Sequence, residues 1–280
     1  MVSVLTLVHG RPRHLDNVLA GLENSAVKPD EVIVVHMNEK AQPRKSRCFP
    51  IVSLEVSGEG TLPLAAARNI AASSATYPER IFLDVDCIPN AELVGRYVKA
   101  MRDAPGALYQ GEVRYLPAHV DASTATVAHL QSVACEHPLH AFRTGGGEMP
   151  YALFWSLNFA CTKTVFDKIG GFDLRYRGYG GEDTDFSYRA RQQGVALVSS
   201  PALAFHQYHR TYDPPLNHLV DIVNNAEVFR RIWGVWPMRG WLDAFEERGY
   251  IRMLSEHVER IRLPSDHEIA ACMNQTRNGF

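Results

Sequence analysis

Ile81-Phe82-Leu83-Asp84-Val85-Asp86-Cys87-Ile88-Pro89 is the stretch around which the chain is organised. An apolar run, predicted to be a buried strand, ends in two carboxylates one residue apart, and a proline is expected to stop the strand. In open α/β sheets, ligands bind beyond the carboxyl ends of the strands. Two acids at such an end can hold Mg²⁺ or Mn²⁺ against an anionic substrate. A lone Asp-x-Asp pair is more often a solvated strand end, so this interpretation depends on partners elsewhere in the chain.

Charge and composition describe an ordinary globular protein. The 280 residues include 29 Lys and Arg, 31 Asp and Glu, and 46% hydrophobic residues. Because acids and bases are interspersed, no basic face is expected, which argues against nucleic acid as a partner. No apolar run approaches the ~20 residues of a membrane span, so we expect a cytoplasmic protein. Peripheral contact of the C-terminal third with the inner face of a membrane, or with another enzyme, stays open.

The five cysteines are scattered along the chain and never form a Cys-x-x-Cys pair. This pattern favours free thiols in a reducing compartment over a disulfide framework or a zinc ribbon. The cysteines are Cys48, Cys87, Cys135, Cys161 and Cys272.

Strand-like and helix-like segments alternate along most of the chain. Strands are predicted at residues 2–8, 31–35, 51–56, 107–116, 151–161, 195–198 and 202–205. Helices are predicted at residues 11–22, 63–71, 90–101, 122–136, 164–169 and 182–193, and again from residue 216 onward. This order predicts an α/β fold: a Rossmann-like, mostly parallel central sheet flanked by helices, with a helical C-terminal tail. Residues 143–150 are typical of a loop, either a mobile lid or a tolerant surface loop.

A second acidic cluster, Gly180-Gly181-Glu182-Asp183-Thr184-Asp185-Phe186, opens one of the predicted helices. Acids in a first helical turn gain about 0.3–1 kcal/mol each from the helix dipole, so capping alone could explain them. Two features favour a functional role. The cluster is denser than a cap needs, and the preceding residues 176–181 are rich in glycine and aromatic side chains, as if the backbone passed close to a ligand. A carboxylate on a rigid helix start can serve as general base for a hydroxyl group.

His206 and His209 follow a predicted strand after this helix. A single buried histidine is more often structural, yet imidazole is an acceptable Mn²⁺ ligand beside two carboxylates. The local pattern of strand and then loop does not fit a helical zinc site.

The order of these motifs resembles the GT-A glycosyltransferases over about the first 210 residues. Residues 170–173, Gly-Gly-Phe-Asp, followed by the Gly-Gly-Glu-Asp block look most like the galactosyltransferase-type motif of β-1,4-galactosyltransferases and chondroitin-type polymerases, close to glycosyltransferase family 2. The motifs that carry the resemblance are the first βαβ unit, Ala67-Arg68-Asn69, Phe82-Leu83-Asp84-Val85-Asp86, these two blocks and a late histidine.

The resemblance implies a GT-A catalytic domain at residues 1–212, with a nucleotide-binding part at about 1–118 and an acceptor part at about 119–212. Residues 213–280 would form a helical C-terminal extension. The implied reaction is metal-dependent transfer of a sugar from a nucleotide-diphosphate donor, a UDP-sugar by default, to a hydroxyl group of a glycan or another acceptor.

The resemblance also implies a role for each motif residue. Asp86 would bind Mn²⁺ or Mg²⁺, with Asp84 reaching the ribose or the metal shell, and His206 would complete the metal site, with His209 in reserve. Asp183 would be the base that deprotonates the acceptor, which favours inversion of the anomeric configuration, and Glu182 would bind a sugar. The residues implied in nucleotide binding are Arg68, Val8, His9, Arg11 and Asn38, and those implied in contacts with sugars are Trp155, Tyr179 and Gly181.

Two segments depart from the family pattern. Many relatives carry an acidic residue just after the second strand, where this chain has His36-Met37-Asn38-Glu39. The first strand exits through Val8-His9-Gly10-Arg11 rather than the commoner Pro-Thr-Tyr-Asn type of turn. Both leave the identity of the nucleotide open. Trp155 and Tyr179 are at least as typical of ordinary core or surface aromatic residues as of residues that stack on sugars.

Two other functions share some of these features. A sugar-nucleotide pyrophosphorylase also joins metal carboxylates to an α/β nucleotide fold, but it needs a Gly-rich basic loop after the first strand, of which His9-Gly10-Arg11 is a poor version. A non-catalytic sugar- or nucleotide-binding relative would have no need to keep Asp84, Asp86 and Asp183 together with a late histidine.

Overall fold

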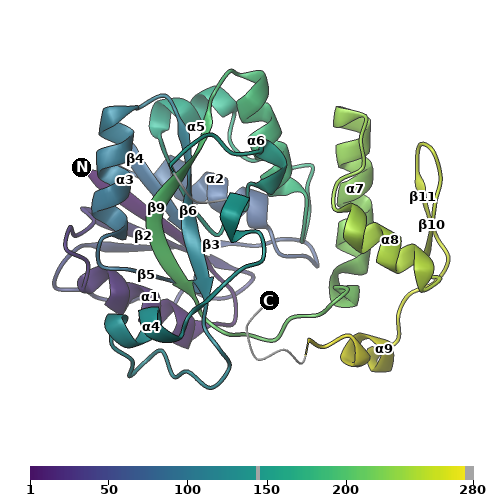
Figure 1. Cartoon of the computed structure of the whole chain (residues 1–280), viewed down its shortest axis with the longest axis horizontal. Helices are drawn as coiled ribbons and strands as arrows, with labels where there is room; N and C mark the ends of the chain where they lie inside the picture. The colour runs from purple at the N-terminus through teal and green to yellow at the C-terminus, as the bar shows by residue number, and fades with distance from the viewer. Residues whose placement is uncertain (143–145, 275–280) are drawn as a thin grey trace.

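A computed structural model describes residues 1–142 and 146–274 and has an α/β body beside a smaller C-terminal unit (Figure 1). Residues 143–145, at the start of the predicted lid loop, lie outside the described part, as do residues 275–280. The five cysteines are free thiols, as expected. Within the described residues, no helix is both long enough and apolar enough to cross a membrane.

A nine-stranded sheet forms the centre of the body, in the order β3-β2-β1-β4-β8-β6-β9-β5, with β7 paired to β6. Strands β1, β2, β3, β4, β6 and β9 run in one direction, and β5, β7 and β8 run against them. The predicted mostly parallel sheet is therefore confirmed. The strands are β1 Val2–Val8, β2 Glu31–Met37, β3 Ile51–Val56, β4 Glu79–Leu83, β5 Cys87–Pro89, β6 Leu108–Tyr115, β7 Cys135–Glu136, β8 Asn158–Thr162 and β9 Leu197–His206.

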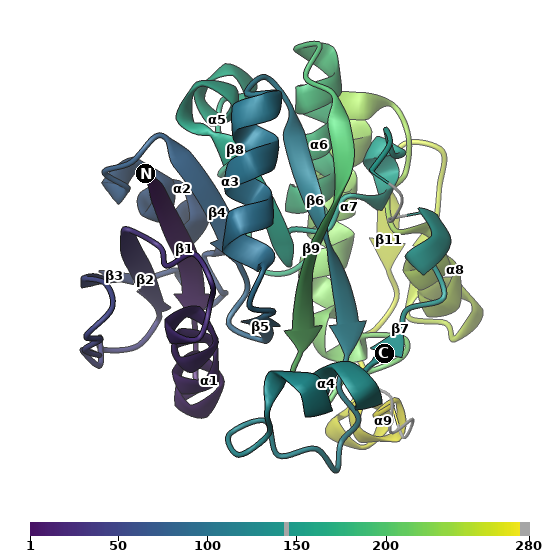
Figure 2. The same ribbon diagram turned by 60° about the vertical axis from the view of Figure 1, so that its left-hand side comes forward.

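Helices cover both faces of the sheet, which explains why β1 and β2 are apolar almost throughout. Helices α1 and α3 pack on one face in one hydrophobic cluster, and α2, α5 and α6 pack on the other face in a second. Figure 2 shows α3 lying across the first of these faces. The helices of the body are α1 Pro12–Glu23, α2 Leu64–Ser74, α3 Leu93–Asp103, α4 Val127–Val133, α5 Lys163–Ile169 and α6 Glu182–Gln192.

The Asp-x-Asp segment differs from its prediction. Strand β4 ends at Leu83, so Asp84 and Asp86 lie in a turn, which the Cys87 N–H closes by donating to the Asp84 carbonyl oxygen at 2.9 Å. Pro89 does not stop this strand, because the chain crosses over and forms β5 against β9. A proline is tolerated there because β5 is a short strand at the edge of the sheet.

Three other elements also differ from their predictions. The predicted strand 151–161 shortens to β8, because Tyr151–Leu153 forms a 3₁₀ turn after Pro150. The predicted helix 122–136 shortens to α4, which begins where the Thr126 hydroxyl accepts a hydrogen bond from the His129 N–H. The two strands predicted at 195–198 and 202–205 are one strand, β9, and its irregular pairing with β6 is absorbed near Gly111.

The C-terminal unit has its own hydrophobic cluster, which includes Leu219, Ile222, Leu242 and Phe245. Its helices are α7 Leu219–Trp233, α8 Arg239–Glu247 and α9 Asp266–Ala271. The predicted helical tail also contains an antiparallel hairpin that was not predicted, formed by β10 Ile251–Met253 and β11 Val258–Arg260. The division of the chain at residue 212 remains a prediction.

Gly111 is a close-packed point at the centre of the body. A Cβ atom there would overlap the Asn158 amide, the Tyr97 hydroxyl and the Ala202 carbonyl group. These groups bond to one another: the Asn158 Nδ2 donates to the Ala202 oxygen at 2.8 Å, and the Tyr97 hydroxyl donates to Asn158 Oδ1 at 2.9 Å.

We therefore expect Gly111→Ala to lower the free energy of unfolding by about 1–3 kcal/mol, as overpacking does in other cores. Urea denaturation measures this change. Gly106→Ala is the matched control, because a Cβ atom at Gly106 meets nothing within 4 Å. Equal stability of the two variants would contradict this close packing around Gly111.

Candidate active site

Pairing between β5 and β9 brings the Asp-x-Asp turn to the late histidines. Cys87 pairs with His206, and the Gln207 N–H donates to the Asp86 carbonyl oxygen at 2.6 Å. As a result, one ligand atom from each of Asp86, His206 and His209 lies within 4.8 Å of the others. His209, expected only in reserve, belongs to this cluster as fully as His206.

The cluster has the chemistry of a divalent-cation site. Asp86 is 3% exposed, and the buried His206 Nδ1 has no hydrogen-bond partner among residues 1–142 and 146–274. Burial, reinforced by positive neighbours, lowers the pKa of both His206 and His209, which favours the neutral imidazole that binds metals. A carboxylate with two imidazoles fits Mn²⁺. Asp84 is not one of the three clustered residues.

Two residues at the start of the first helix contact Asp86: Arg11, which precedes α1, and His14 in its first turn. The Arg11 guanidinium forms an ion pair with Asp86, and the His14 Nδ1 lies 2.6 Å from Asp86 Oδ1. Burial and then the Arg11 charge lower the pKa of His14 to about 4, so its ring is neutral at pH 7. His14 is not among the predicted site residues. Its spacing of three residues from Arg11, at the start of a predicted helix, was the available signal.

Asp84 lies on the opposite side of the turn, against Arg68 of α2. Both residues line a small cavity of about 40 Å³ together with Met37 and Ser156. Burial raises the pKa of the Asp84 carboxyl group, and the charges of Arg68 and Arg11 oppose this shift. Asp84 is therefore influenced by the charges of both Arg11 and Arg68.

The second acidic cluster begins helix α6, as predicted. Gly181 precedes it with φ +85°. The buried Glu182 forms an ion pair with Arg68, whose Nη1 donates to Glu182 Oε1 at 3.0 Å. The other oxygen of Glu182, Oε2, is buried and has no hydrogen-bond partner in the described part of the chain. Burial, and then the Glu182 charge, raises the pKa of Asp183 to about 7, which Arg68 partly opposes. Asp183 is thus a carboxylate suited to accept a proton at neutral pH.

The two aromatic residues expected to contact sugars lie in different surroundings. Tyr179 is 38% exposed and stacks on His218 at 4.5 Å between ring centroids. Burial of its hydroxyl group, followed by the charges of Asp183 and Glu182, raises the pKa of Tyr179. Trp155 packs edge-on against the His137 ring at 5.0 Å.

The residues expected at the first two strand exits are held by local contacts. The Val8 side chain is buried in the core. The His9 Nδ1 lies 2.7 Å from the Met37 carbonyl oxygen. Asn38 fixes the loop at residues 58–61, because its amide donates to the Thr61 carbonyl oxygen at 2.9 Å and accepts from the Gly58 N–H at 2.7 Å. Their part in nucleotide binding remains a prediction.

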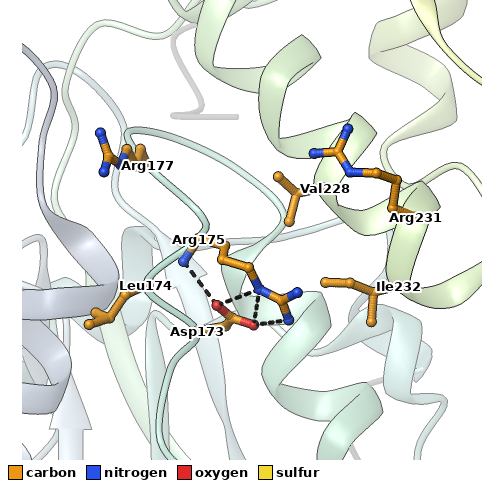
Figure 3. A pocket seen from close by; sticks show the side chains of 7 residues that line it. All are labelled: Asp173, Leu174, Arg175, Arg177, Val228, Arg231 and Ile232. Atoms are coloured by element: carbon orange, nitrogen blue, oxygen red, sulfur yellow. Dashed lines mark hydrogen bonds and ion pairs between the residues drawn. The ribbon is translucent and has the colours of Figure 1, made fainter.

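A larger cavity, of about 510 Å³, lies apart from these acids, between residues 173–177 and α7 (Figure 3). Its carboxylate, Asp173, is engaged by Arg175, with Oδ2 2.6 Å from the Arg175 Nη2. Because the described lining holds no histidine and no second acid, this cavity lacks the groups for the chemistry of the Asp86 site. The lining residues are Asp173, Leu174, Arg175, Arg177, Val228, Arg231 and Ile232.

Parts of the sequence are similar to glycosyltransferases. Residues 136–214 match the family model described as the N-terminal domain of galactosyltransferase. Validoxylamine A glucosyltransferase of Streptomyces hygroscopicus subsp. jinggangensis is 38% identical over 116 residues, covering 41% of this chain and 26% of that protein. Chondroitin synthase of Pasteurella multocida is 24% identical over 237 residues, covering 74% of this chain and 24% of that protein. The chain spans about a quarter of the length of these curated relatives.

Comparisons of the structure identify the fold. S. aureus TarS in complex with UDP superposes with a TM-score of 0.57 at 14% identity, covering 88% of this chain and 75% of that one. GalNAc-T7 with UDP, GalNAc and Mn²⁺ superposes with a TM-score of 0.56 at 14% identity, covering 75% of this chain and 44% of that one. The chain has the GT-A fold, as the motifs predicted.

The raised pKa of Asp183 implies that the free energy of unfolding depends on pH. A carboxyl group with a pKa of 3.8 in the unfolded chain and about 7 in the folded protein binds its proton more tightly when folded. Its contribution to stability therefore falls as the pH rises through this window. We expect Asp183→Asn to stabilise the protein more at pH 8 than at pH 5, as measured by urea denaturation. Asp103→Asn, at an exposed helix end, is the control, and an Asp183→Asn effect that does not change with pH would contradict the assignment.

Proposed function

We propose that this chain is a metal-dependent, inverting glycosyltransferase that moves a sugar from a nucleotide-diphosphate donor to a hydroxyl group of a glycan or another acceptor. The observation that carries the proposal is that Asp84 is influenced by the charges of both Arg11, which pairs with Asp86, and Arg68, which pairs with Glu182. These charged residues link two groups: the Asp86–His206–His209 cluster, and Asp183, a carboxyl group with a pKa of about 7. Transfer of a sugar needs both charge neutralisation at a leaving diphosphate and a base for the acceptor.

Asp86, His206 and His209 are the residues that would hold the cation, with Mn²⁺ favoured over Mg²⁺ by the two imidazoles. The chemistry that a bound cation supplies is neutralisation of the negative charge gained by the departing diphosphate. Arg11, which pairs with Asp86, is a second positive group within reach of a donor phosphate.

Asp183 takes the proton of the acceptor hydroxyl as the new bond forms between the acceptor oxygen and the anomeric carbon. The bond from that carbon to the diphosphate oxygen breaks in the same displacement, and the bonding pair leaves with the diphosphate. A base at this position favours inversion, because a retaining enzyme of this fold would not need one. Glu182 Oε2, buried without a partner in the described residues, is available to accept a hydrogen bond from a sugar hydroxyl while Arg68 holds its other oxygen.

The relatives support the identity of the donor. TarS has been crystallised with UDP and with UDP-GlcNAc, and GalNAc-T7 with UDP and Mn²⁺. A UDP-sugar is therefore the first donor to test. The match of residues 136–214 to a galactosyltransferase domain supports placing the chain near the β-1,4-galactosyltransferases and family 2.

The donor site can be tested by thermal shift with UDP, in Mn²⁺ and in EDTA. A ligand at about 100 times its Kd adds about 2.7 kcal/mol to the stability of the folded state, so we expect UDP with Mn²⁺ to raise the melting temperature by about 5 °C. EDTA and Asp86→Asn should each abolish the shift, whereas Asp103→Asn should retain it. A shift of the same size in EDTA would exclude a metal-dependent donor site.

The role of Asp183 as general base can be tested by enzyme kinetics. Removing a general base costs about 10²–10⁴-fold, so we expect Asp183→Asn to lower kcat by at least about 100-fold while the donor KM changes less than about twofold. In the unsubstituted enzyme, kcat should fall as the pH drops below about 7, because Asp183 becomes protonated. Asp167→Asn, an exposed carboxylate of α5, is the control. A kcat of Asp183→Asn within tenfold of the unsubstituted enzyme would remove Asp183 from this role.

A further inference from the structure

The larger cavity beside α7 lies where the body meets the C-terminal unit (Figure 3). Residues 173–177, which precede the acidic helix, form one wall, and the second half of α7 forms the other. Sites for small organic ligands usually have volumes of roughly 300–1,000 Å³, and this cavity has about 510 Å³. It is therefore large enough for an organic molecule and not only for a single ion.

The described lining of this cavity carries a positive charge. Three arginines and one aspartate stand in it, so its net charge is +2. The aspartate is already matched, because Arg175 donates to both oxygens of Asp173, with Nε 3.1 Å from Oδ1 and Nη2 2.6 Å from Oδ2. These hydrogen bonds lower the pKa of Asp173. The charges of the other two arginines, Arg177 and Arg231, are available to a ligand.

Arg177 and Arg231 have few partners within residues 1–142 and 146–274. Arg177 bonds there to Asn225 through its backbone N–H and carbonyl groups, and its guanidinium forms no ion pair or hydrogen bond. Figure 3 shows this guanidinium at the rim of the cavity, turned away from α7. Arg231 Nη1 lies 3.9 Å from Glu227 Oε2, and its side chain is 66% exposed. Because an exposed pair at this distance contributes little, Arg231 on the wall and Arg177 at the rim can both serve an anion.

Aliphatic side chains make up the rest of the described lining. Leu174 is 60% exposed, and Val228 and Ile232 of α7 are half-buried. Figure 3 shows the Arg175 side chain extending from the loop toward Ile232. Arg231 shares a helix face with Val228, three residues earlier. Positive and apolar groups therefore alternate along the cavity, which suits a ligand with an anionic group beside an apolar one.

Helix α7 also holds the loop that directly follows this cavity in the chain. Asn225 is 2% exposed, and its amide bonds to backbone groups at several points of the loop. Its Nδ2 donates to the carbonyl oxygens of Arg177, Tyr179 and Gly180 at 3.0, 3.3 and 2.8 Å. Its Oδ1 accepts from the Arg177 N–H at 3.1 Å. The segment that lines the cavity is thus continuous with one that α7 fixes.

Asp221, one turn earlier on α7, completes this attachment. Its Oδ2 accepts from the Tyr179 N–H at 3.2 Å. The carboxylate occupies the space that a Cβ atom of residue 178 would need, and Gly178 has φ +70°. Glycine is therefore required at residue 178 both for its backbone conformation and for the close approach of α7. A ligand in the cavity would add a further link to this joint between loop and helix.

We propose that the cavity is a second ligand site, apart from the Asp86 site, and that it takes a phosphate monoester of an apolar group. A phosphate monoester carries about −1.5 to −2 charges at pH 7, which matches the charge of the lining. Guanidinium groups suit phosphate oxygens, because they can donate two parallel hydrogen bonds. The aliphatic side chains of Leu174, Val228 and Ile232 would contact the ester group. A bound ligand would hold the loop against α7 and so act on the segment that leads to Asp183.

Isothermal titration calorimetry of the full chain with phenyl phosphate, in EDTA and without a donor, tests the proposal. We expect phenyl phosphate to bind at least about threefold more tightly than inorganic phosphate, because only the ester has an apolar group to bury. Arg231→Gln should weaken the binding of phenyl phosphate about tenfold, which is about 1.4 kcal/mol. Arg239→Gln is the matched control, since Arg239 is an exposed arginine of α8 outside the lining. Equal affinity in the two variants, or no binding of phenyl phosphate, would overturn the proposal.

Hydrogen exchange locates the bound ligand. Phenyl phosphate should slow exchange at residues 173–177 and in the second half of α7, because it links the two walls. Slowed exchange at residues 84–86 instead would place the ligand in the Asp86 site and overturn the proposal. Because neither metal, donor nor turnover is involved, the result is separate from that of the proposed function. Arg231→Gln should keep the melting-temperature shift with UDP and Mn²⁺.

Vesicles of phosphatidylcholine, with and without phosphatidic acid, identify the source of the phosphate ester. Sedimentation with the phosphatidic acid vesicles, abolished by Arg231→Gln, would support the site and assign it to a lipid headgroup. Binding of phenyl phosphate without such sedimentation would support it and assign it to a soluble ester. Sedimentation without binding of phenyl phosphate would overturn the proposal, because the face would then be a membrane-contact surface rather than a site for a small ligand.

Discussion

The ion pair between Arg68 and Glu182 is the interaction on which the rest of the site depends. Both side chains are buried, and a buried charge is tolerated only when an opposite charge and hydrogen bonds compensate it. Arg68 comes from α2 and Glu182 from α6, so the pair ties together two helices that are 114 residues apart in sequence. Arg68 also opposes the raised pKa values of Asp84 and Asp183. One guanidinium thus counteracts the charges of three carboxyl groups.

The fold could be predicted wherever the pattern of side chains is local. The apolar runs of β1 and β2 and the amphipathic spacing of α1 gave their elements to within a few residues, because both patterns repeat within a single element. The failures occurred where strands are very short or where pairing with a distant segment decides the structure. Strand β5 is three residues long and exists only because β9 lies beside it, and the β10–β11 hairpin is equally short. Strands of this length have too few residues to show a period.

The site could be predicted as a set of motifs but not as a set of contacts. The acids at residues 84, 86, 182 and 183 were recognisable because they stand close together in two short stretches of the sequence. Their partners were not recognisable: His14 lies 72 residues from Asp86, and Gln207 reaches both the His14 and the Val85 carbonyl oxygens across the fold. The contacts of α7 with the loop before α6 could not be read from the sequence either, because Asn225 lies in an ordinary amphipathic helix.

The attachment of the loop at residues 176–181 to α7 limits how this protein can change. A side chain at residue 178 would overlap the Asp221 carboxylate and would be strained at φ +70°, and Asn225 bonds to three carbonyl groups of this loop. Substitutions at Gly178 or Asn225 are therefore costly, because loop and helix depend on each other. An engineer who transplants the loop into another protein of this fold would have to move α7 with it.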